Sequence, residues 1–145
     1  MAVQRMDHVS VIVDDLEAAT AFFGELGLER EGGAAVEGDW VDRVNGIDDV
    51  RVDIVMMVAP DGGRLELTRF RSPEVLMPEP SNATPNLLGL RSVMFEVDDI
   101  DDTVERLRAH GGELVGEIAE YERYYRLCYL RGPAGVIVSL AESLG

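Results

Sequence analysis

The chain is poor in thiol groups, because its 145 residues include a single cysteine, Cys128. One thiol cannot form a disulfide within the chain, and it fits a reducing compartment. The first residues, MAVQRMDH, lack the basic segment followed by an apolar segment that marks a secretory signal. No apolar run approaches the roughly 20 residues that a transmembrane helix needs. These absences lead us to expect a cytoplasmic protein.

Positive charge is also scarce. The chain has 28 acidic and 13 basic residues, which gives a formal net charge of −15. A chain without a basic patch cannot displace the counterions of nucleic-acid phosphates, and an anionic membrane surface would repel it. We therefore expect no nucleic acid and no membrane among its partners, and we interpret the acidic surface as a source of solubility. The chain also lacks a nucleophile elbow, a phosphate-binding loop and a glycine-rich dinucleotide signature.

Two stretches of the chain resemble each other at an offset of 84 residues. Residues 6–27 (MDHVSVIVDDLEAATAFFGELG) and 90–111 (LRSVMFEVDDIDDTVERLRAHG) each hold an apolar, β-branched run, then Asp-Asp, then a helical pattern. Asp at that place predicts a helix N-cap, and Gly27 and Gly111 predict the helix ends. Neither short strand–helix unit can bury a face alone, so the repeat predicts two packed modules. The offset makes Ser92 the counterpart of His8.

The remaining segments extend each copy to the element order β-α-β-β-β. Residues 39–49 are expected to form a long loop, and residues 71–89, which hold four of the six prolines, a linker. A second offset of 73 residues aligns the turn at Pro60 with that at Pro133, and it makes Ser139 the counterpart of Glu66. The further expected strands are residues 28–36, 50–59 and 64–70 in the first module, and 113–120, 124–130 and 136–141 in the second.

Four segments give the whole chain a resemblance to a known family: DHVSVIVDDLEAATAFFGELGLE, PDGGRLELTRF, VMFEVDDID and RGPAGVIVSLAE. They resemble the vicinal oxygen chelate superfamily, which includes glyoxalase I, methylmalonyl-CoA epimerase, extradiol dioxygenases, fosfomycin-resistance thiol transferases and bleomycin-binding proteins. The resemblance implies one α+β domain over residues 1–145, in which two βαβββ modules (about 6–70 and 90–141) form a cupped half-barrel. It also implies a homodimer. The activity stays open, since this fold hosts unrelated functions.

The resemblance also implies a metal site, which this sequence keeps only in part. In the family's metalloenzymes the first and last strands of each module supply His or Gln and Glu to one divalent ion. The first module keeps both ligands, His8 and Glu66, whereas Ser92 and Ser139 replace them in the second. Serine is a poor ligand for a transition metal beside imidazole and carboxylate, and two ligands hold an ion weakly. Glu96 faces the same side as Ser92 and could serve as a third ligand with His8 and Glu66, but it lies roughly 13 Å further along the strand at about 3.3 Å per residue, which is far for direct coordination.

Three functions therefore remain open. The favoured one is a protein that holds a small organic molecule in the cup, without a cofactor. The first alternative is a lyase, isomerase or dioxygenase of the glyoxalase type that depends on Zn, Ni, Fe or Mn. The second is a metal-free enzyme in which His8 and Glu66, on one face of adjacent strands, act as an acid/base pair. An inward carboxylate needs a partner or else takes up a proton, and Ser92, Ser139 and His8 could all supply hydrogen bonds to Glu66. His8 could also be a hydrogen-bonded residue of the cavity wall.

The ligand would lie against apolar and aromatic side chains. Met and Tyr residues adapt to flat organic molecules or stack against them. Met56, Tyr124 and Tyr129 belong to the wider set of candidates, in which the methionines could equally be core filler. The residues that we expect to bind the ligand are Trp40, Met57, Ser92, Met94, Glu96, Tyr121, Tyr125 and Ser139.

Overall fold

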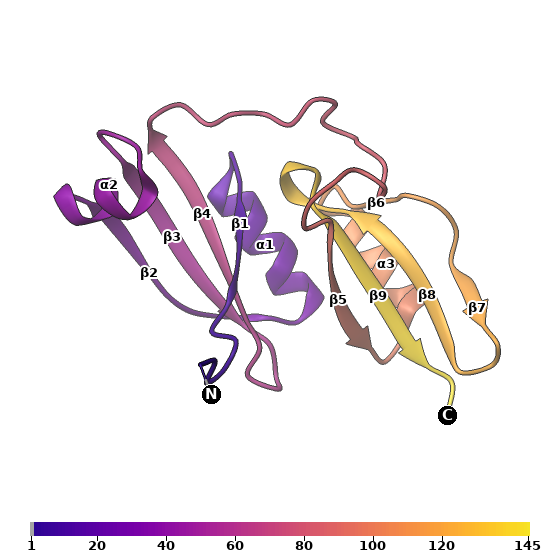
Figure 1. The fold of residues 1–145 in the computed structure, drawn as a ribbon. Helices are drawn as coiled ribbons and strands as arrows, with labels where there is room; N and C mark the ends of the chain where they lie inside the picture. The colour runs from indigo at the N-terminus through magenta and orange to yellow at the C-terminus, as the bar shows by residue number, and fades with distance from the viewer. Residues whose placement is uncertain (1) are drawn as a thin grey trace. The chain divides into compact units, whose positions relative to one another are not determined.

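The chain folds into two compact units, one ending at Leu76 and the other beginning at Met77. The structure is a computed structural model that describes residues 2–145. Each unit is built on its own β-sheet with few helices, which is an α+β architecture as predicted (Figure 1). Within the described residues, no helix combines the length and the apolar character needed to cross a membrane.

The first unit holds a four-stranded sheet in the order β1-β4-β3-β2. The first and last strands lie side by side and run parallel, while β4, β3 and β2 are antiparallel neighbours. Because β3 is flanked on both edges, it is a central strand, as its apolar sequence predicted. The bounds are β1 (Val9–Ile12), β2 (Glu29–Glu37), β3 (Arg51–Val58) and β4 (Arg64–Ser72).

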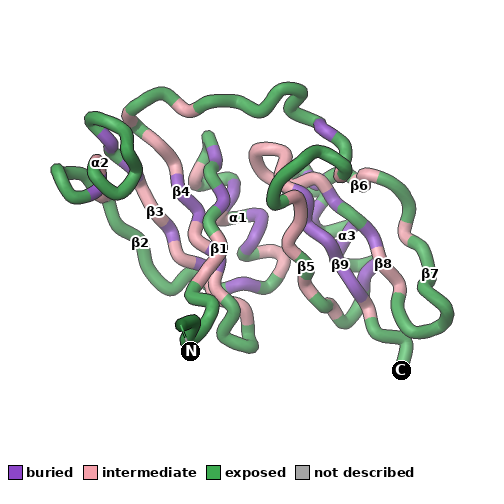
Figure 2. Tube along the Cα trace, in the orientation of Figure 1, coloured by how far each residue is buried: buried purple, intermediate pink, exposed green. Residues whose placement is uncertain are grey.

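Helix α1 (Leu16–Leu26) covers one face of this sheet and contacts β2, β3 and β4. Asp15 is the N-cap that the sequence predicted, and its carboxylate accepts a hydrogen bond of 3.0 Å from the backbone N–H of Ala18. Gly27 ends the helix at φ 124°, a value that glycine adopts without a steric penalty. Figure 2 shows the buried stretch along α1. The buried residues of the helix are Ala19, Phe22 and Phe23.

Residues 39–49 do not form the predicted loop, because they begin with a short helix, α2 (Asp39–Asn45). Val41 is the buried residue of this helix, and it forms an apolar cluster with Val50 and Val52. The carboxylate of Asp42 accepts hydrogen bonds from the backbone N–H groups of Asp49 (3.1 Å) and Val50 (2.8 Å), which ties the helix to the start of β3. A helix of two turns with one buried side chain leaves no helical periodicity to recognise.

The second unit holds a sheet in the order β5-β9-β8-β6, with β7 also paired to β8. Its first and last strands, β5 and β9, again run parallel. The single strand predicted for residues 113–120 is wrong, since it divides into β6 and β7 around Gly116, and glycine weakens a strand interior. The bounds are β5 (Ser92–Val97), β6 (Glu113–Leu114), β7 (Ala119–Tyr121), β8 (Tyr125–Arg131), the short 3₁₀ helix η1 (Pro133–Gly135) and β9 (Ile137–Ser143).

Helix α3 (Ile100–Arg108) contacts β8 and β9. Its N-terminus is held by acidic side chains: Asp99 accepts from the Asp102 N–H at 3.0 Å, and Glu142 accepts from the Ile100 N–H at 2.8 Å. Asp101 in the first turn receives two hydrogen bonds from the Arg126 guanidinium, at 2.6 and 3.1 Å. These bonds hold the pKa of the Asp101 carboxyl below its ordinary value.

The pairing registers of the two sheets match the two sequence offsets. In the first sheet, Ser10 lies opposite Glu66, and in the second, Met94 lies opposite Ser139. Met94 follows Ser10 by 84 residues, and Ser139 follows Glu66 by 73. The third strands also correspond, because β3 pairs antiparallel with β4 as β8 does with β9. The duplication therefore extends from element order to residue register.

The turn between β7 and β8 holds two side chains in an unfavourable backbone region. Glu122 and Arg123 have φ values of 53° and 106°, where glycine or asparagine is preferred. We expect Arg123→Gly to raise the free energy of unfolding by about 1 kcal/mol, because glycine adopts this conformation without the Cβ clash. Urea denaturation measures the change. Arg123→Ala is the matched control, since it removes the same charge but keeps the Cβ, and an equal gain there would contradict the explanation.

Candidate functional site

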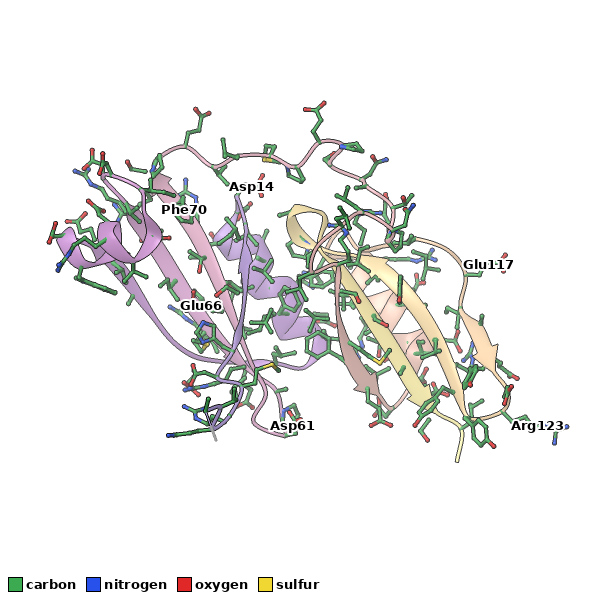
Figure 3. All side chains as sticks on the ribbon, in the orientation of Figure 1. Asp14, Asp61, Glu66, Phe70, Glu117 and Arg123 are labelled. Atoms are coloured by element: carbon green, nitrogen blue, oxygen red, sulfur yellow. The ribbon has the colours of Figure 1, made fainter. Side chains whose placement is uncertain are left out.

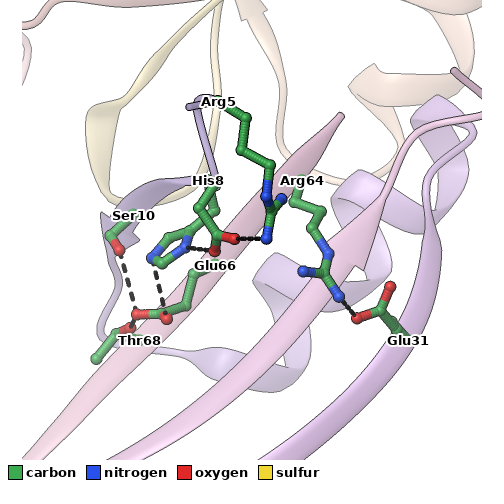
Figure 4. A network of polar contacts seen from close by, with 8 residues as sticks. Arg5, His8, Ser10, Glu31, Arg64, Glu66 and Thr68 are labelled. Carbon is green, nitrogen blue, oxygen red and sulfur yellow. Dashed lines mark hydrogen bonds and ion pairs between the residues drawn. The ribbon is translucent and has the colours of Figure 1, made fainter. Parts of the chain in front are cut away.

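His8 and Glu66 lie against each other on the first sheet, on the face opposite α1 (Figure 4). His8 immediately precedes β1 and Glu66 lies in β4, so the parallel pairing of these two strands brings the side chains together. The His8 Nε2 and Glu66 Oε2 atoms are 3.3 Å apart, and the side chains are 31% and 18% exposed. The predicted contact is therefore observed, and both groups remain accessible.

Two hydroxyl groups fix the Glu66 carboxylate. Ser10 Oγ donates to Oε1 at 3.1 Å and Thr68 Oγ1 donates to the same oxygen at 2.8 Å. Oε2 is thereby directed toward His8. Of the possible partners named from the sequence, His8 lies beside Glu66, but the hydroxyl donors are Ser10 and Thr68 and not Ser92 or Ser139. The signal was present in the alternation of the strands, which places Ser10 on the His8 face and Thr68 on the Glu66 face.

Asp7 holds the other side of the imidazole, a role that the sequence analysis missed. His8 Nδ1 donates to Asp7 Oδ2 at 2.8 Å, and Arg5 forms an ion pair with Asp7 at 2.5 Å. The hydrogen bond from His8, and then the charge of Arg5, lower the pKa of the Asp7 carboxyl. With Nδ1 donating to Asp7, a neutral ring presents Nε2 as an acceptor, so a hydrogen bond to Glu66 requires a second ring proton. The ring thus has one fixed nitrogen and one nitrogen available for proton exchange.

The Asp7 carboxyl is expected to titrate below 3.8, the ordinary value for Asp. Folding lowers this pKa. The stability that the Asp7–His8 contact contributes is therefore fully present above pH 3.8, and it is lost as the pH falls through the lower pKa of the folded state. His8→Ala removes the largest cause and should move the titration up toward 3.8. Carboxyl ¹³C NMR measures this. Arg5→Ala should give a smaller upward shift, and an unchanged titration in His8→Ala would contradict this explanation.

The second sheet does not repeat the polar set of the first. By offset and register, the residues that correspond to His8, Ser10, Glu66 and Thr68 are Ser92, Met94, Ser139 and Ala141, in that order. One hydroxyl therefore replaces the carboxylate, and two apolar side chains replace the hydroxyls that orient it. Glu96, the proposed third ligand, lies exposed on β5 in the second unit.

One expected ligand contact on the first unit, Met57, is wrong, and the element that carries another, Trp40, differs from the prediction. Met57 is only 1% exposed and lies opposite Leu65, on the face that packs under α1. The residue on the Glu66 face is Met56, which lies opposite Glu66 in register. Trp40 lies on α2 with 57% of its surface exposed, so it is accessible but belongs to a helix and not to a loop. The run VRVDIVMMVA has apolar residues on both faces of the strand. The sequence alone therefore does not show which of the two methionines lies on the Glu66 face.

The tyrosines gather on the β7–β8 hairpin. Tyr121 and Tyr125 are exposed register partners at its end, near the turn residue Arg123 labelled in Figure 3. A cavity of about 290 Å³, which the sequence did not indicate, lies between β8 and the segment that joins β6 to β7. Its lining residues are Val115, Gly116, Glu117, Leu127, Cys128 and Tyr129. Burial raises the pKa of the Cys128 thiol, so this sulfur stays protonated and is a weak nucleophile.

The metal that the resemblance implied would find only half of a donor set in the first unit. The spacing of His8 Nε2 and Glu66 Oε2 suits two adjacent ligands, each about 2.0–2.2 Å from an ion. Asp7 on the far nitrogen and the hydroxyls on Glu66 resemble the outer shell of a metal site. Within residues 2–145, however, no group of three or more His, Cys, Asp or Glu side chains could hold an ion. The donor set therefore does not fit a tightly bound transition metal.

Comparisons with known proteins place the fold and the family. A crystal structure of a glyoxalase family protein from Bacillus cereus is 50% identical, with a TM-score of 0.94 over 100% of this chain and 99% of that one. A glyoxylase/bleomycin resistance protein/dioxygenase domain from Frankia sp. EAN1pec is 17% identical (TM-score 0.67, 98% and 93% covered).

A mutant of the fosfomycin resistance protein FosX from Listeria monocytogenes, complexed with Mn(II) and 1S,2S-dihydroxypropylphosphonic acid, is 16% identical (TM-score 0.63, 99% and 91% covered). A search of curated proteins found no match. A sequence model of the Glyoxalase/Bleomycin resistance protein/Dioxygenase superfamily matches residues 5–140. The chain belongs to this superfamily.

Proposed function

We propose that the chain binds a small organic molecule, and that His8 and Glu66 contact a polar group of that molecule. The observation that carries the proposal is a carboxylate and an imidazole held 3.3 Å apart, oriented from behind and still accessible. Preorganised polar groups of this kind fix the orientation of a ligand in a largely apolar site. Two protein ligands are too few for a resident transition metal. Binding without a metal is therefore the function that this geometry supports best.

The neighbouring side chains indicate which kind of molecule fits. Met56 lies opposite Glu66, and Ile54 lies opposite Thr68, so an apolar surface begins directly beside the polar pair. Further along β4, Phe70 packs against the apolar cluster under α2 (Figure 3). Glu66 Oε2 can accept a hydrogen bond from a hydroxyl or amine. We infer a ligand with one such donor and an apolar body several carbons long.

A fragment screen by ¹⁵N NMR tests the proposal. Binding molecules should shift the amide signals of His8, Ser10 and Met56, and Glu66→Gln should weaken their binding by about tenfold, as expected for a hydrogen bond to a charged group. Glu74→Gln, which changes an exposed carboxylate outside the sheet, is the matched control. Fragments that bind elsewhere, or that bind Glu66→Gln as well as the parent, would overturn the proposal.

A second candidate function is metal-free acid/base catalysis. The contact series Asp7–His8–Glu66 favours it, since a carboxylate fixes one ring nitrogen and leaves the other beside a proton acceptor. In this function His8 Nε2 or Glu66 Oε2 takes a proton from the bound molecule, and the other group returns it. Proton exchange of a bound fragment with deuterated water should fall by about 10²-fold or more in His8→Gln. Equal exchange rates in the parent and in His8→Gln would end this candidate.

The assembly and the compartment are also proposals. We infer a homodimer, as the family resemblance implies, and light scattering should give twice the chain mass of 15.9 kDa. A mass of one chain at micromolar concentration would contradict it. The single cysteine, Cys128, is free and buried, and it supports a reducing compartment such as the cytoplasm.

A further inference from the structure

Arg64 brings a positive charge to the face of the first sheet opposite α1, beside the His8–Glu66 pair. It lies two residues before Glu66 on β4, so the two side chains share one face at a spacing of roughly 6.6 Å, at about 3.3 Å per residue. Figure 4 shows the guanidinium in the same polar network as the imidazole. The His8 hydrogen bond, and then the charges of Arg5 and Arg64, lower the pKa of the Asp7 carboxyl, so Arg64 lies within electrostatic reach of the pair.

Most of the hydrogen-bond donors of Arg64 are unused. Its Nη2 group meets Oε1 of Glu31, which is its one carboxylate partner among the described residues. An arginine carries five N–H donors in a planar fork, which matches a carboxylate through two parallel hydrogen bonds. The side chain of Arg64 is 31% exposed, so a bound molecule can reach the remaining donors.

Glu31 is a weak competitor for this guanidinium. It lies on the edge strand β2, at the bulge between Arg30 and Gly32, and its side chain is 41% exposed. Ion pairs between exposed side chains contribute little to stability, because water screens both charges and the long side chains lose freedom in the contact. A ligand carboxylate whose molecule is also anchored at Glu66 has the advantage over Glu31, because the first contact raises its effective concentration at the second.

The order of groups along β4 indicates which molecule matches them. The strand presents the cation of Arg64, then the carboxylate of Glu66, and then the apolar surface that Met56 and Ile54 of β3 supply. A complementary molecule therefore carries a carboxylate, an amine and an apolar group in that order. Two hydrogen bonds of about 2.9 Å, joined through the single carbon between the amine and the carboxylate of an α-amino acid, span the spacing of the two charged residues.

We propose that the site at His8 and Glu66 binds a free α-amino acid with an apolar side chain, and that Arg64 is the specificity-determining residue for its carboxylate. The proposal rests on the proposed function, whose hydroxyl or amine donor it identifies as the amine of a zwitterion. Glu66 Oε2 accepts from this amine, the fork of Arg64 holds the carboxylate, and the apolar side chain lies against Met56. A zwitterion has no net charge, whereas a simple acid would be repelled by Glu66 and Glu31 in a chain of net charge −15.

Three probes that differ by one charged group test the inference. Leucine carries both groups, isoamylamine lacks the carboxylate, and 4-methylpentanoic acid lacks the amine. In ¹⁵N NMR titrations of the full chain, leucine should shift the amides of His8, Ser10 and Met56, and it should bind about tenfold more tightly than either other probe, the effect of a hydrogen bond to a charged group. Arg64→Gln should remove the preference for leucine over isoamylamine. Arg51→Gln, which breaks another arginine–glutamate pair between β3 and β2, should keep it.

Glu31→Gln separates a role of Arg64 in binding from a role in holding β2. If Arg64 only ties β4 to β2, Glu31→Gln and Arg64→Gln break the same contact and should have equal effects. If Arg64 binds the carboxylate, removing its competitor should raise the affinity for leucine by about threefold, while Arg64→Gln lowers it. Arg64→Lys, which keeps the charge but loses the fork, should retain only part of the preference for leucine.

Three results would overturn the inference. These are equal binding of leucine and isoamylamine to the parent, an unchanged preference for leucine in Arg64→Gln, or weaker leucine binding in Glu31→Gln. In each of these cases, loss of isoamylamine binding in Glu66→Gln would leave the proposed function intact. If Glu66→Gln binds leucine and isoamylamine as tightly as the parent does, the proposed function fails and this inference fails with it.

Discussion

The double substitution Ser92→His with Ser139→Glu is expected to raise the affinity of the chain for Ni²⁺ or Zn²⁺ by about tenfold or more. The register explains why. Ser92 and Ser139 occupy the positions on β5 and β9 that His8 and Glu66 occupy beside β1 and in β4. The substitution therefore creates a second imidazole–carboxylate pair on a backbone that already has the required spacing. Calorimetric titration of each metal into the parent and the variant measures the gain.

The hydroxyl groups that orient the carboxylate allow a more specific form of this prediction. Glu66 is oriented by Ser10 and Thr68, whose counterparts are Met94 and Ala141. Adding Met94→Ser and Ala141→Thr to the double variant should increase its metal affinity by a further factor of about 10–100.

Ser92→Ala with Ser139→Ala is the control for the double variant, and it should bind metal no better than the parent. The parent should purify without a stoichiometric transition metal. Elemental analysis that finds close to one Zn, Ni, Fe or Mn per chain, lost in His8→Ala, would contradict the interpretation.

Phe22→Ala is expected to lower the free energy of unfolding of the first unit by about 3–5 kcal/mol. Phe22 is fully buried in α1, and its ring packs edge-on against Phe23 with centroids 5.1 Å apart. Removing it leaves a cavity between the helix and the sheet that rigid strands cannot fill. Urea denaturation measures the loss. Val44→Ala, at a position 77% exposed, should change it by less than about 0.5 kcal/mol. A loss below about 1 kcal/mol in Phe22→Ala would show that the core repacks around the gap.

The repeat predicted the element order, and the family resemblance predicted that the first and last strands of each module lie side by side. Two offsets, 84 and 73, aligned the first strands and the last strands separately, and both alignments reappear as residue pairs in the sheets. The contact between His8 and Glu66 followed from the same reasoning, since each strand exposes every second residue on one face. Helix caps at Asp15 and Asp99 were also predicted, because Asp-Asp before a helical pattern has one favourable local structure.

The errors arose where local patterns carry no information about tertiary contacts. Helix α2 depends on packing against Val50 and Val52 and on the bonds from Asp42 to the following strand, and neither is visible in seven residues of sequence. Met57 and Met56 are adjacent in an apolar run, so only the observed register could assign them to opposite faces. Asp7 was missed because a neighbour of a candidate ligand points away from it in an extended strand, whereas Asp7 and His8 lie before β1 begins.

The alternation of faces in the two sheets also has an evolutionary consequence. Leu65, Leu67 and their counterparts Val138 and Leu140 are all buried on the helix-covered faces, where a change of volume costs stability. The opposite face of the same strands has changed from His8 and Glu66 to two serines without altering the pairing register. Substitutions on the open face are thus expected to leave the buried face of the same strand unchanged. In a duplicated module of this kind, point substitutions on that face can alter the chemistry of one copy while the strand pairing stays the same.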